Sequence, residues 1–295
     1  MKTTETVGMI GVGNMGHPIA LNLIDAGYRI VGYEIDKSRW KPTDQLSYVE
    51  DIGYLTTQTK VILLSLPDRF AVQDIIEELL NLDLTHKLAI VDTSTIGAKA
   101  SQEIGYSVRN SELEYLDSPV SGGVRGAVAG TLAVMCAGSK NLYTLVLPIL
   151  TAFTANQFLI GSEPGQAQTI KVVNNFLSAT ALAASCEALH FGQSQGLDLK
   201  TMCDVINVST GMNTATLDKV PNQIITNRFS AGFSNSLLLK DISLYLDGCD
   251  ETGIEGAISQ TVVQLWDKFV GEHPDEDATA IFNYIVNTNR STSNV

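Results

Sequence analysis

The sequence predicts an α/β fold, in which a Rossmann-type doubly wound parallel sheet is followed by an all-α C-terminal domain. In the first half of the chain, short runs rich in β-branched residues alternate with amphipathic segments, a pattern typical of βαβ units. The runs at 61–65 and 88–92 are apolar at nearly every position, as expected of parallel strands covered by helices on both faces. Beyond about residue 161, helix-forming residues dominate and no convincing strand remains.

The first domain is expected over residues 1–163 and the second over residues 164–295. Because the stretch between 34 and 61 is short and contains Pro42, the second helix of the first domain is expected to be stunted. The polar tail at 287–295 is expected to fray. Strands are predicted at 6–10, 29–33, 61–65, 88–92, 114–117, 131–137 and 157–160. Helices are predicted at 17–26, about 71–80, 165–196, 198–209, 217–227, 237–252 and 255–269.

Composition and charge exclude several classes of protein. With 295 residues, 44% hydrophobic and 17% charged, the chain is expected to form about two globular domains. Acidic residues outnumber basic ones, 32 to 19, and the net charge of −13 argues against nucleic acid or an anionic membrane as a partner. No stretch reaches the roughly 20 apolar residues of a membrane span and no signal peptide is evident, so a cytoplasmic location is expected. The four cysteines lie far apart, which favours free thiols over disulfides or a zinc site.

Gly11, Gly13 and Gly16 form a G-x-G-x-x-G motif between the first predicted strand and the first predicted helix. Such a motif alone is weak evidence, but its position agrees with a dinucleotide-binding turn. Gly11 permits the tight turn, Gly13 lets a pyrophosphate approach the backbone, and Gly16 lets helix and strand pack closely. Asn14 and Met15 lie in the same turn, where the N–H groups of the helix N-terminus can bind phosphates.

An acid at the end of the second predicted strand favours NAD as the cofactor. Glu34 follows Gly16 by 18 residues, and its carboxylate suits the hydroxyls of a ribose and would repel the 2′-phosphate of NADP. Lys37 and Arg39 lie close enough to weaken that preference, so NADP stays open. Ligands of such sheets bind at the carboxyl ends of the strands. Further cofactor contacts are expected from the next two loops at this edge, at Leu66, Pro67 and Thr95.

Two further segments point to a substrate. Ser121 precedes Gly122 and Gly123, and such a loop exposes N–H groups that suit a small carboxylate, although alone it could be an ordinary connection. Lys171 and Asn175 are four residues apart, on one face of a predicted helix and among apolar neighbours. A lysine in apolar surroundings loses proton affinity and can act as an acid or base, but alone Lys171 could equally reach the surface.

The four histidines argue against other catalytic classes. None lies in a motif that pairs it with a carboxylate, and His17 belongs to the predicted nucleotide-binding helix. The sequence therefore predicts neither a histidine-based hydroxyacid dehydrogenase nor a Ser-His-Asp triad, and it predicts no metal site.

Four segments together resemble the β-hydroxyacid dehydrogenases, the family that includes 3-hydroxyisobutyrate dehydrogenase and tartronate semialdehyde reductase. They are GVGNMG, DSPVSGGVRGAVAGTL, GQAQTIKVVNN and LLLKD, in the family's order over nearly the whole chain. The resemblance implies Lys171 as the catalytic acid/base and Asn175 beside the substrate. It implies that Ser121, Gly122 and Gly123 hold the substrate carboxylate.

The LLLKD segment and the loop before it carry the remaining implications of the resemblance. Lys240 is implied near the nicotinamide, as a contact of cofactor and substrate, and Asp241 is implied to position its helix. Ala167 stands where the family commonly has glycine, a change expected to be harmless. Asn213 and Thr214 fall where the family varies with substrate, and their polarity favours a polar substrate.

These observations lead to the hypothesis of an NAD(P)-dependent dehydrogenase of a small β-hydroxy acid, similar to 3-hydroxyisobutyrate or a polar analogue of it. Lys171 would take the hydroxyl proton as general base while the Ser121–Gly123 loop holds the carboxylate. Two alternatives stay open: a non-catalytic dehydrogenase-like module that binds a nucleotide or acts as a scaffold, and a reductase of a small aldehyde acid such as tartronate semialdehyde. A homodimer or homotetramer is expected, because apolar helices need a partner to cover them.

Overall fold

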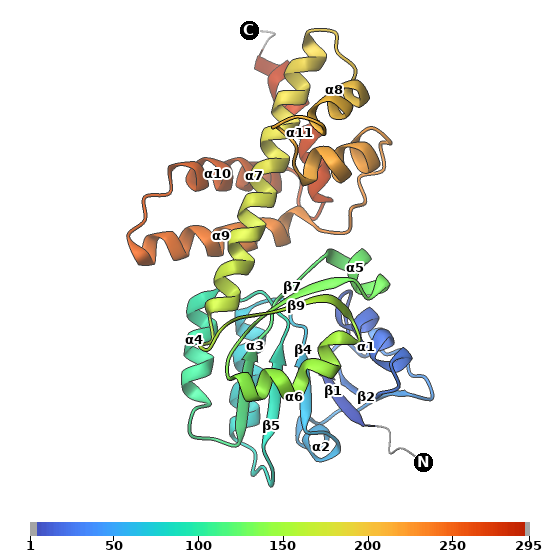
Figure 1. Cartoon of the computed structure of the whole chain (residues 1–295), viewed down its shortest axis with the longest axis vertical. Coiled ribbons are helices and arrows are strands. Elements are labelled where there is room, and N and C mark those ends of the chain that lie inside the picture. The colour runs from blue at the N-terminus through green and yellow to red at the C-terminus, as the bar shows by residue number, and fades with distance from the viewer. Residues whose placement is uncertain (1–4, 293–295) are drawn as a thin grey trace. The chain divides into compact units, whose positions relative to one another are not determined.

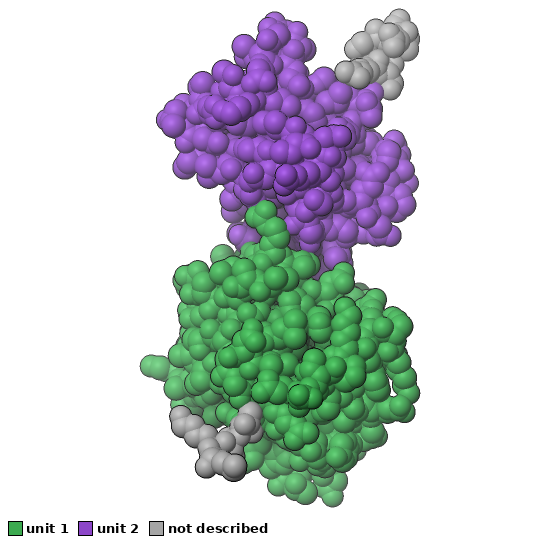
Figure 2. Space-filling model, turned by 90° about the vertical axis from the view of Figure 1, so that its right-hand side faces the viewer, with its two compact units in different colours: residues 1–171 green, residues 172–295 purple. Residues whose placement is uncertain are grey.

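The computed structural model describes the backbone of residues 5–292 and the side chains of residues 5–288. The chain forms two compact units, unit 1 (Met1–Lys171) and unit 2 (Val172–Val295), which Figure 2 shows in different colours. The division falls within the long helix α7 (Gln166–Ser194), which contributes its first residues to unit 1 and the rest to unit 2.

Unit 1 contains a mixed sheet whose first six strands are parallel. Their order is β3-β2-β1-β4-β5-β6, so the predicted Rossmann-type sheet is confirmed (Figure 1). The next strand in space, β8, is antiparallel to β6 and β7 and parallel to β9, and the expectation of a parallel sheet is wrong there. The strands are β1 (Thr6–Ile10), β2 (Arg29–Tyr33), β3 (Leu46–Tyr48), β4 (Val61–Leu64), β5 (Leu88–Asp92), β6 (Leu113–Asp117), β7 (Val120–Ser121), β8 (Leu132–Ala137) and β9 (Thr154–Gly161).

Helices cover both faces of this sheet, which explains why β4 and β5 are buried at every position. Residues of α1, α5 and α6 share one hydrophobic cluster with the sheet, and residues of α2, α3 and α4 share another. A single 3₁₀ turn, η1 (Lys37–Arg39), joins β2 to β3, in agreement with the predicted stunted helix. The helices are α1 (Gly16–Asp25), α2 (Ile52–Gln58), α3 (Arg69–Leu80), α4 (Ala98–Ser107), α5 (Gly123–Ala129) and α6 (Lys140–Thr151).

Unit 2 is helical, as predicted, and within the described residues its one β-type pairing is an isolated bridge between Ser234 and Asp277. Its core gathers around the buried Trp266 and Phe269. The predicted frayed tail is wrong as far as Thr292, because α11 includes it, and 293–295 lie outside the described residues. Besides α7, the helices are α8 (Leu199–Ile206), the π-helix η2 (Ala215–Ile224), α9 (Asn235–Thr252), α10 (Ala257–Glu272), η3 (Ala278–Ala280) and α11 (Ile281–Thr292).

Candidate active site

The glycine turn between β1 and α1 is packed too closely for side chains. Gly11 has a φ of +85°, and a Cβ there would clash with the carbonyl oxygen of Ser65. A Cβ on Gly16 would clash with the carbonyl oxygen of Gly11. No side chain caps the first turn of α1 at Met15. The turn therefore brings bare backbone to the carboxyl edge of the sheet, as a pyrophosphate requires.

Glu34 follows β2, and its buried carboxylate holds the glycine turn. Oε2 accepts the N–H of Val12 at 2.9 Å, and Oε1 accepts the N–H of Asp36 at 3.0 Å. Each oxygen keeps capacity for a further hydrogen bond. The exposed Arg39 forms an ion pair with Asp36 at 3.2 Å, and its Nη1 would lie 3.2 Å from a Cβ on Gly13. An acid and a cation thus both adjoin the predicted cofactor turn.

The loops after β4 and β5 meet at the same edge of the sheet. Leu66 donates its N–H to Ser94 Oγ at 2.9 Å, and Leu66 Cδ2 would lie 3.0 Å from a Cβ on Gly11. Pro67 is exposed and Thr95 is partly buried. Within unit 1 the structure therefore brings Leu66 to the glycine turn and links the two loops through Ser94.

The Ser121–Gly123 loop joins the last residue of β7 to the first residue of α5. Ser121 pairs with Ala133 of β8, and Gly122 and Gly123 have φ values of +132° and +63°. A Cβ on Gly122 would lie 2.9 Å from Leu132 Cδ2, whereas space around Gly123 is open. Consecutive glycines with positive φ are typical of loops that direct N–H groups toward an anion.

A buried hydrogen-bonded cluster, here called the clasp, attaches the start of α7 to the ends of β5 and β6. Asp117 Oδ2 accepts the N–H groups of Gly165 and Gln168, at 2.9 and 3.2 Å, and Oδ1 accepts Gln168 Nε2 at 2.7 Å. Gln168 Nε2 also donates to the carbonyl of Ser94 at 3.0 Å. Lys171, 8% exposed, follows Gln168 by three residues, so the clasp fixes the turn that carries it.

Two carboxylates of this region are buried on neighbouring strands. Asp92 of β5 pairs in register with Asp117 of β6, and Asp92 Oδ2 accepts the hydroxyl of Tyr115 at 2.9 Å. Burial raises the pKa of each aspartate to about 6, because N–H and O–H donors offset only part of the lost hydration.

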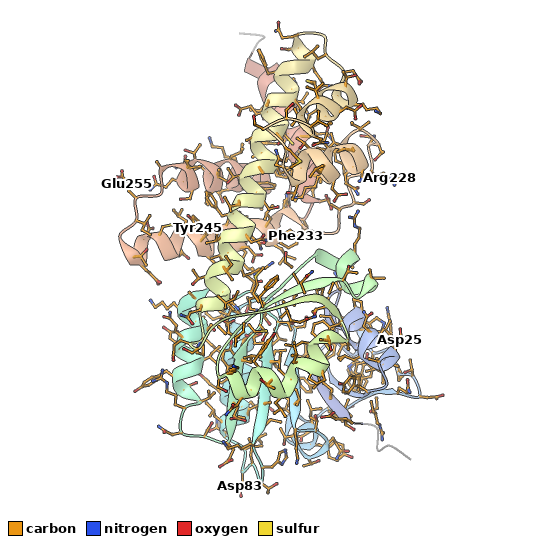
Figure 3. The ribbon with its side chains drawn as sticks, in the orientation of Figure 1. Asp25, Asp83, Arg228, Phe233, Tyr245 and Glu255 are labelled. Carbon is orange, nitrogen blue, oxygen red and sulfur yellow. The ribbon has the colours of Figure 1, made fainter. Side chains whose placement is uncertain are left out.

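In unit 2, Asp241 connects two residues predicted to bind substrate. Its Oδ2 accepts the Asn175 amide at 2.6 Å, and its Oδ1 lies 3.2 Å from the Lys240 ammonium. Asp241 and Asn175 are buried, at 3% and 6% exposed, whereas the Lys240 side chain is 30% exposed. The Phe176 and Tyr245 rings stack with centroids 4.3 Å apart and hold α7 against α9; Tyr245 is labelled in Figure 3. The structure thus brings Asn175 and Lys240 together through Asp241.

Sequence reasoning missed the clasp and the structural role of one polar residue. Asp117 lies within DSPVSGG and Gln168 within GQAQTIK, but neither motif indicates that the two side chains meet. Asn213 Oδ1 accepts the N–H groups of Ala215 and Thr216, at 2.9 and 3.3 Å, at the start of η2. Its polarity therefore has a structural explanation at the start of η2, and the expectation of a polar substrate stays a prediction.

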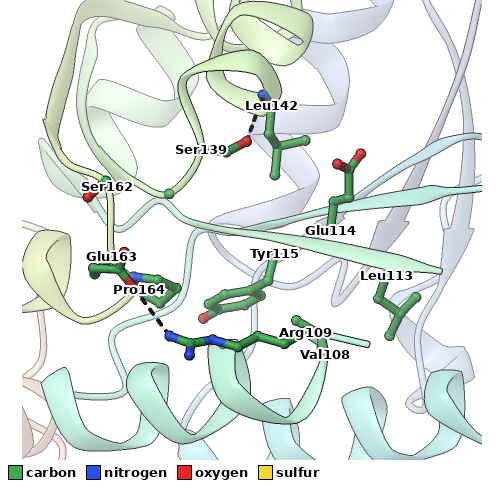
Figure 4. A pocket seen from close by; sticks show the side chains of 12 residues that line it. Val108, Arg109, Leu113, Glu114, Tyr115, Ser139, Leu142, Ser162, Glu163 and Pro164 are labelled. Carbon is green, nitrogen blue, oxygen red and sulfur yellow. Dashed lines mark hydrogen bonds and ion pairs between the residues drawn. The ribbon is translucent and has the colours of Figure 1, made fainter. Parts of the chain in front are cut away.

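A pocket elsewhere in unit 1 is lined by none of the predicted site residues. It occupies about 210 Å³ beside the end of α4, β6 and the connection from β9 to α7 (Figure 4). Arg109 and Glu163 form an ion pair at its rim, at 3.4 Å.

The described residues contain no group of three or more His, Cys, Asp or Glu side chains that could hold a metal ion. The four cysteines are buried free thiols. In the part of the chain that the structure covers, no helix combines the length and apolar character that a membrane crossing needs.

Known families and proteins match nearly the whole chain. Residues 6–161 match the family described as the NAD binding domain of 6-phosphogluconate dehydrogenase. Residues 165–285 match the family described as NAD-binding of NADP-dependent 3-hydroxyisobutyrate dehydrogenase.

Individual relatives cover both units. A probable mitochondrial 3-hydroxyisobutyrate dehydrogenase of Arabidopsis thaliana is 28% identical over 306 residues, 96% of this chain and 88% of the relative. The 2-(hydroxymethyl)glutarate dehydrogenase of Eubacterium barkeri is 27% identical over 271 residues, 90% of each chain. The solved structure of Mycobacterium tuberculosis 3-hydroxyisobutyrate dehydrogenase with L-serine matches with a TM-score of 0.87 and 27% identity, over 96% of this chain and 99% of that one.

Proposed function

The chain belongs to the β-hydroxyacid dehydrogenase family, and on this basis we propose that it oxidises a small β-hydroxy acid with Lys171 as the general acid/base. The protein is an NAD(P)-dependent oxidoreductase that transfers a hydride, and a non-catalytic nucleotide-binding module is not favoured. Small β-hydroxy acids are suggested by relatives named for 3-hydroxyisobutyrate and 2-(hydroxymethyl)glutarate. The opposite direction, reduction of an aldehyde acid, uses the same residues.

The glycine turn supports the binding of the dinucleotide. Gly11 and Gly16 have no space for a Cβ, so the turn packs closely on itself and on the end of β4 and presents its backbone at the N-terminus of α1, where a pyrophosphate can bind. When bound, NAD(P) supplies the nicotinamide that accepts or donates the hydride. The remaining hydrogen-bonding capacity of Glu34 favours NAD, because a ribose hydroxyl can donate to it and a 2′-phosphate would be repelled.

The proposed chemistry divides the work among few side chains. Ser121, Gly122 and Gly123 bind the substrate carboxylate through N–H and O–H donors. Lys171 Nζ takes the proton of the substrate hydroxyl during oxidation and returns it during reduction. Asn175 orients the substrate. Lys240 contacts substrate and cofactor.

The observation that carries this proposal is the burial of Lys171 one helical turn after the clasp. A lysine with a structural or solubilising role has no need of so rigid a support, whereas a proton-transfer group must be held in place.

Lys171→Ala tests the proposal. Nicotinamide absorbance would be followed at 340 nm against a panel of β-hydroxy acids, and NAD(H) binding by fluorescence titration. Removing an acid/base typically costs a factor of about 10²–10⁴ in turnover. Binding of NAD(H) should persist. The exposed Lys200, paired with Asp204 at 2.7 Å, provides the matched control Lys200→Ala. Turnover by Lys171→Ala above half of the wild-type rate would refute the assignment.

We also propose a cytoplasmic homodimer or homotetramer. Exposed apolar side chains on the helices of unit 2 support self-association, since a second copy of the chain could remove them from water. Light scattering coupled to gel filtration measures the assembly directly. These side chains include Leu177, Phe191, Val205, Leu217 and Ile258.

A further inference from the structure

A lysine of unit 2 that the proposed chemistry does not use is held in an unusual setting. Lys219 lies on the π-helix η2, is partly buried, and donates from Nζ to Ser178 Oγ at 2.9 Å. Among the residues that the structure describes, no carboxylate forms an ion pair with it. A π-helix is rare and frequently lies at a functional site.

The electrostatics of Lys219 favour an anion beside it. Burial lowers the pKa of its ammonium, and the charges of Asp218 and Asp277 offset this effect only in part. An ammonium has three donors, of which Ser178 takes one. A ligand carboxylate would accept another donor and stabilise the charged form.

Ser178 connects Lys219 to the proposed substrate residues of unit 2. Ser178 follows Asn175 by three residues on α7, and side chains at this spacing are neighbours on one helix face, with Cβ atoms about 5–6 Å apart. Asn175 in turn bonds Asp241, which pairs with Lys240. One face of α7 therefore presents Asn175 and then the Ser178–Lys219 pair.

We propose that Lys219 and Ser178 bind a second carboxylate of the substrate, so that the preferred substrates are β-hydroxy dicarboxylic acids. This inference rests on the proposed function, because it assumes that Asn175 contacts a β-hydroxy acid. The Lys219 ammonium and the Ser178 hydroxyl both donate hydrogen bonds to that second carboxylate. No bond to Lys219 forms or breaks during the reaction.

The test compares paired substrates in wild type, Lys219→Met and Lys219→Arg. Methionine keeps the length of the side chain without its charge, and arginine keeps the charge. The dicarboxylate probe is 2-(hydroxymethyl)glutarate and the monocarboxylate probe is 3-hydroxyisobutyrate, both followed at 340 nm. Lys200→Met is the control for loss of an exposed lysine. Thermal unfolding of each variant shows whether it remains folded.

The wild type should have at least tenfold higher kcat/KM for the dicarboxylate. Lys219→Met should lower that value about 10- to 100-fold, the loss typical of one hydrogen bond to a charged group. Most of this loss should appear as a higher KM for the dicarboxylate. The kcat/KM for the monocarboxylate should change less than about twofold. Lys219→Arg should recover part of the kcat/KM for the dicarboxylate.

Equal losses on both substrates, or a wild type that prefers the monocarboxylate, would overturn the inference and leave the proposed function intact. If the wild type binds NAD(H) but oxidises neither class of acid, the proposed function fails and this inference fails with it. Binding of glutarate, measured by calorimetry, separates recognition from turnover. Glutarate that binds wild type and Lys219→Met with equal affinity would also overturn the inference.

Discussion

Replacing Gln168 by leucine should destabilise unit 1 and disturb the turn that carries Lys171. The Gln168 side chain uses its full hydrogen-bonding capacity. Oε1 accepts the N–H groups of Ile96 and Gly97, at 3.0 and 3.2 Å. Nε2 donates to the carbonyl of Ser94 at 3.0 Å and to Asp117 Oδ1 at 2.7 Å. Leucine fills a similar volume, so the substitution removes these bonds without opening a large cavity.

The expected loss of stability follows from these bonds. A neutral hydrogen bond contributes about 1 kcal/mol and one to a charged group about 2 kcal/mol, so the total is about 5 kcal/mol. Domains are typically stable by about 5–15 kcal/mol, so this is a large share. A displacement of about 1 Å at a catalytic group can reduce turnover about 100-fold, and kcat of the folded fraction should fall accordingly.

Gln166→Leu is the matched control, because it makes the same change two residues earlier in the same helical turn. Gln166 is exposed, and its Oε1 accepts one N–H, that of Glu163, at 3.0 Å. Urea unfolding followed by circular dichroism should show a loss below about 1 kcal/mol for this variant. If both variants lose the same unfolding free energy, or if Gln168→Leu keeps wild-type kcat, the clasp does not position Lys171.

Two further predictions concern carboxylates. Glu34→Gln should leave one of the N–H groups of Val12 and Asp36 without an acceptor, and it should remove the charge that repels a 2′-phosphate. The ratio of kcat/KM for NADP⁺ to that for NAD⁺ should therefore rise about tenfold, equivalent to about 1.4 kcal/mol. An unchanged ratio would contradict the assignment of Glu34 to the cofactor site. Burial raises the pKa of Asp92 and of Asp117 from 3.8 to about 6, so above pH 6 each carboxylate should lower the free energy of unfolding by about 3 kcal/mol. This cost should vanish below about pH 4, because both groups are then protonated in the folded and in the unfolded chain. Carboxyl-carbon NMR titration should give midpoints near 6, and midpoints near 4 would show that burial does not govern these groups.

The parts of the fold that sequence predicted are those whose cause is local. β4 and β5 could be predicted because strands buried on both faces are apolar throughout. The short β3 and β7 are set by pairing with distant strands, and no pattern of two or three residues reveals that. α6 was missed because its β-branched and aromatic residues and Pro148 resemble a strand followed by a turn.

The candidate site divides in the same way. Glycines that need positive φ or close contact, such as Gly11 and Gly16, are visible in sequence because no other residue fits there. The clasp is invisible in sequence, since Gln168 bonds Asp117 and Ser94 across 51 and 74 residues. The hydrogen bond between Lys219 and Ser178 could not be predicted from the sequence, because it depends on η2 lying against α7 within unit 2.

Desolvation of the adjacent buried carboxylates of Asp92 and Asp117 lowers the stability of the folded state, a cost that apolar side chains at the same positions would not have. An apolar pair would avoid the desolvation that raises both pKa values. It would also leave the N–H groups of Gly165 and Gln168 buried without an acceptor, and the first turn of α7 would lose its attachment to β6. Asp117, at the end of β6, supplies the acceptors at that point, so the desolvation of its carboxylate accompanies the attachment of the turn that carries the proposed acid/base.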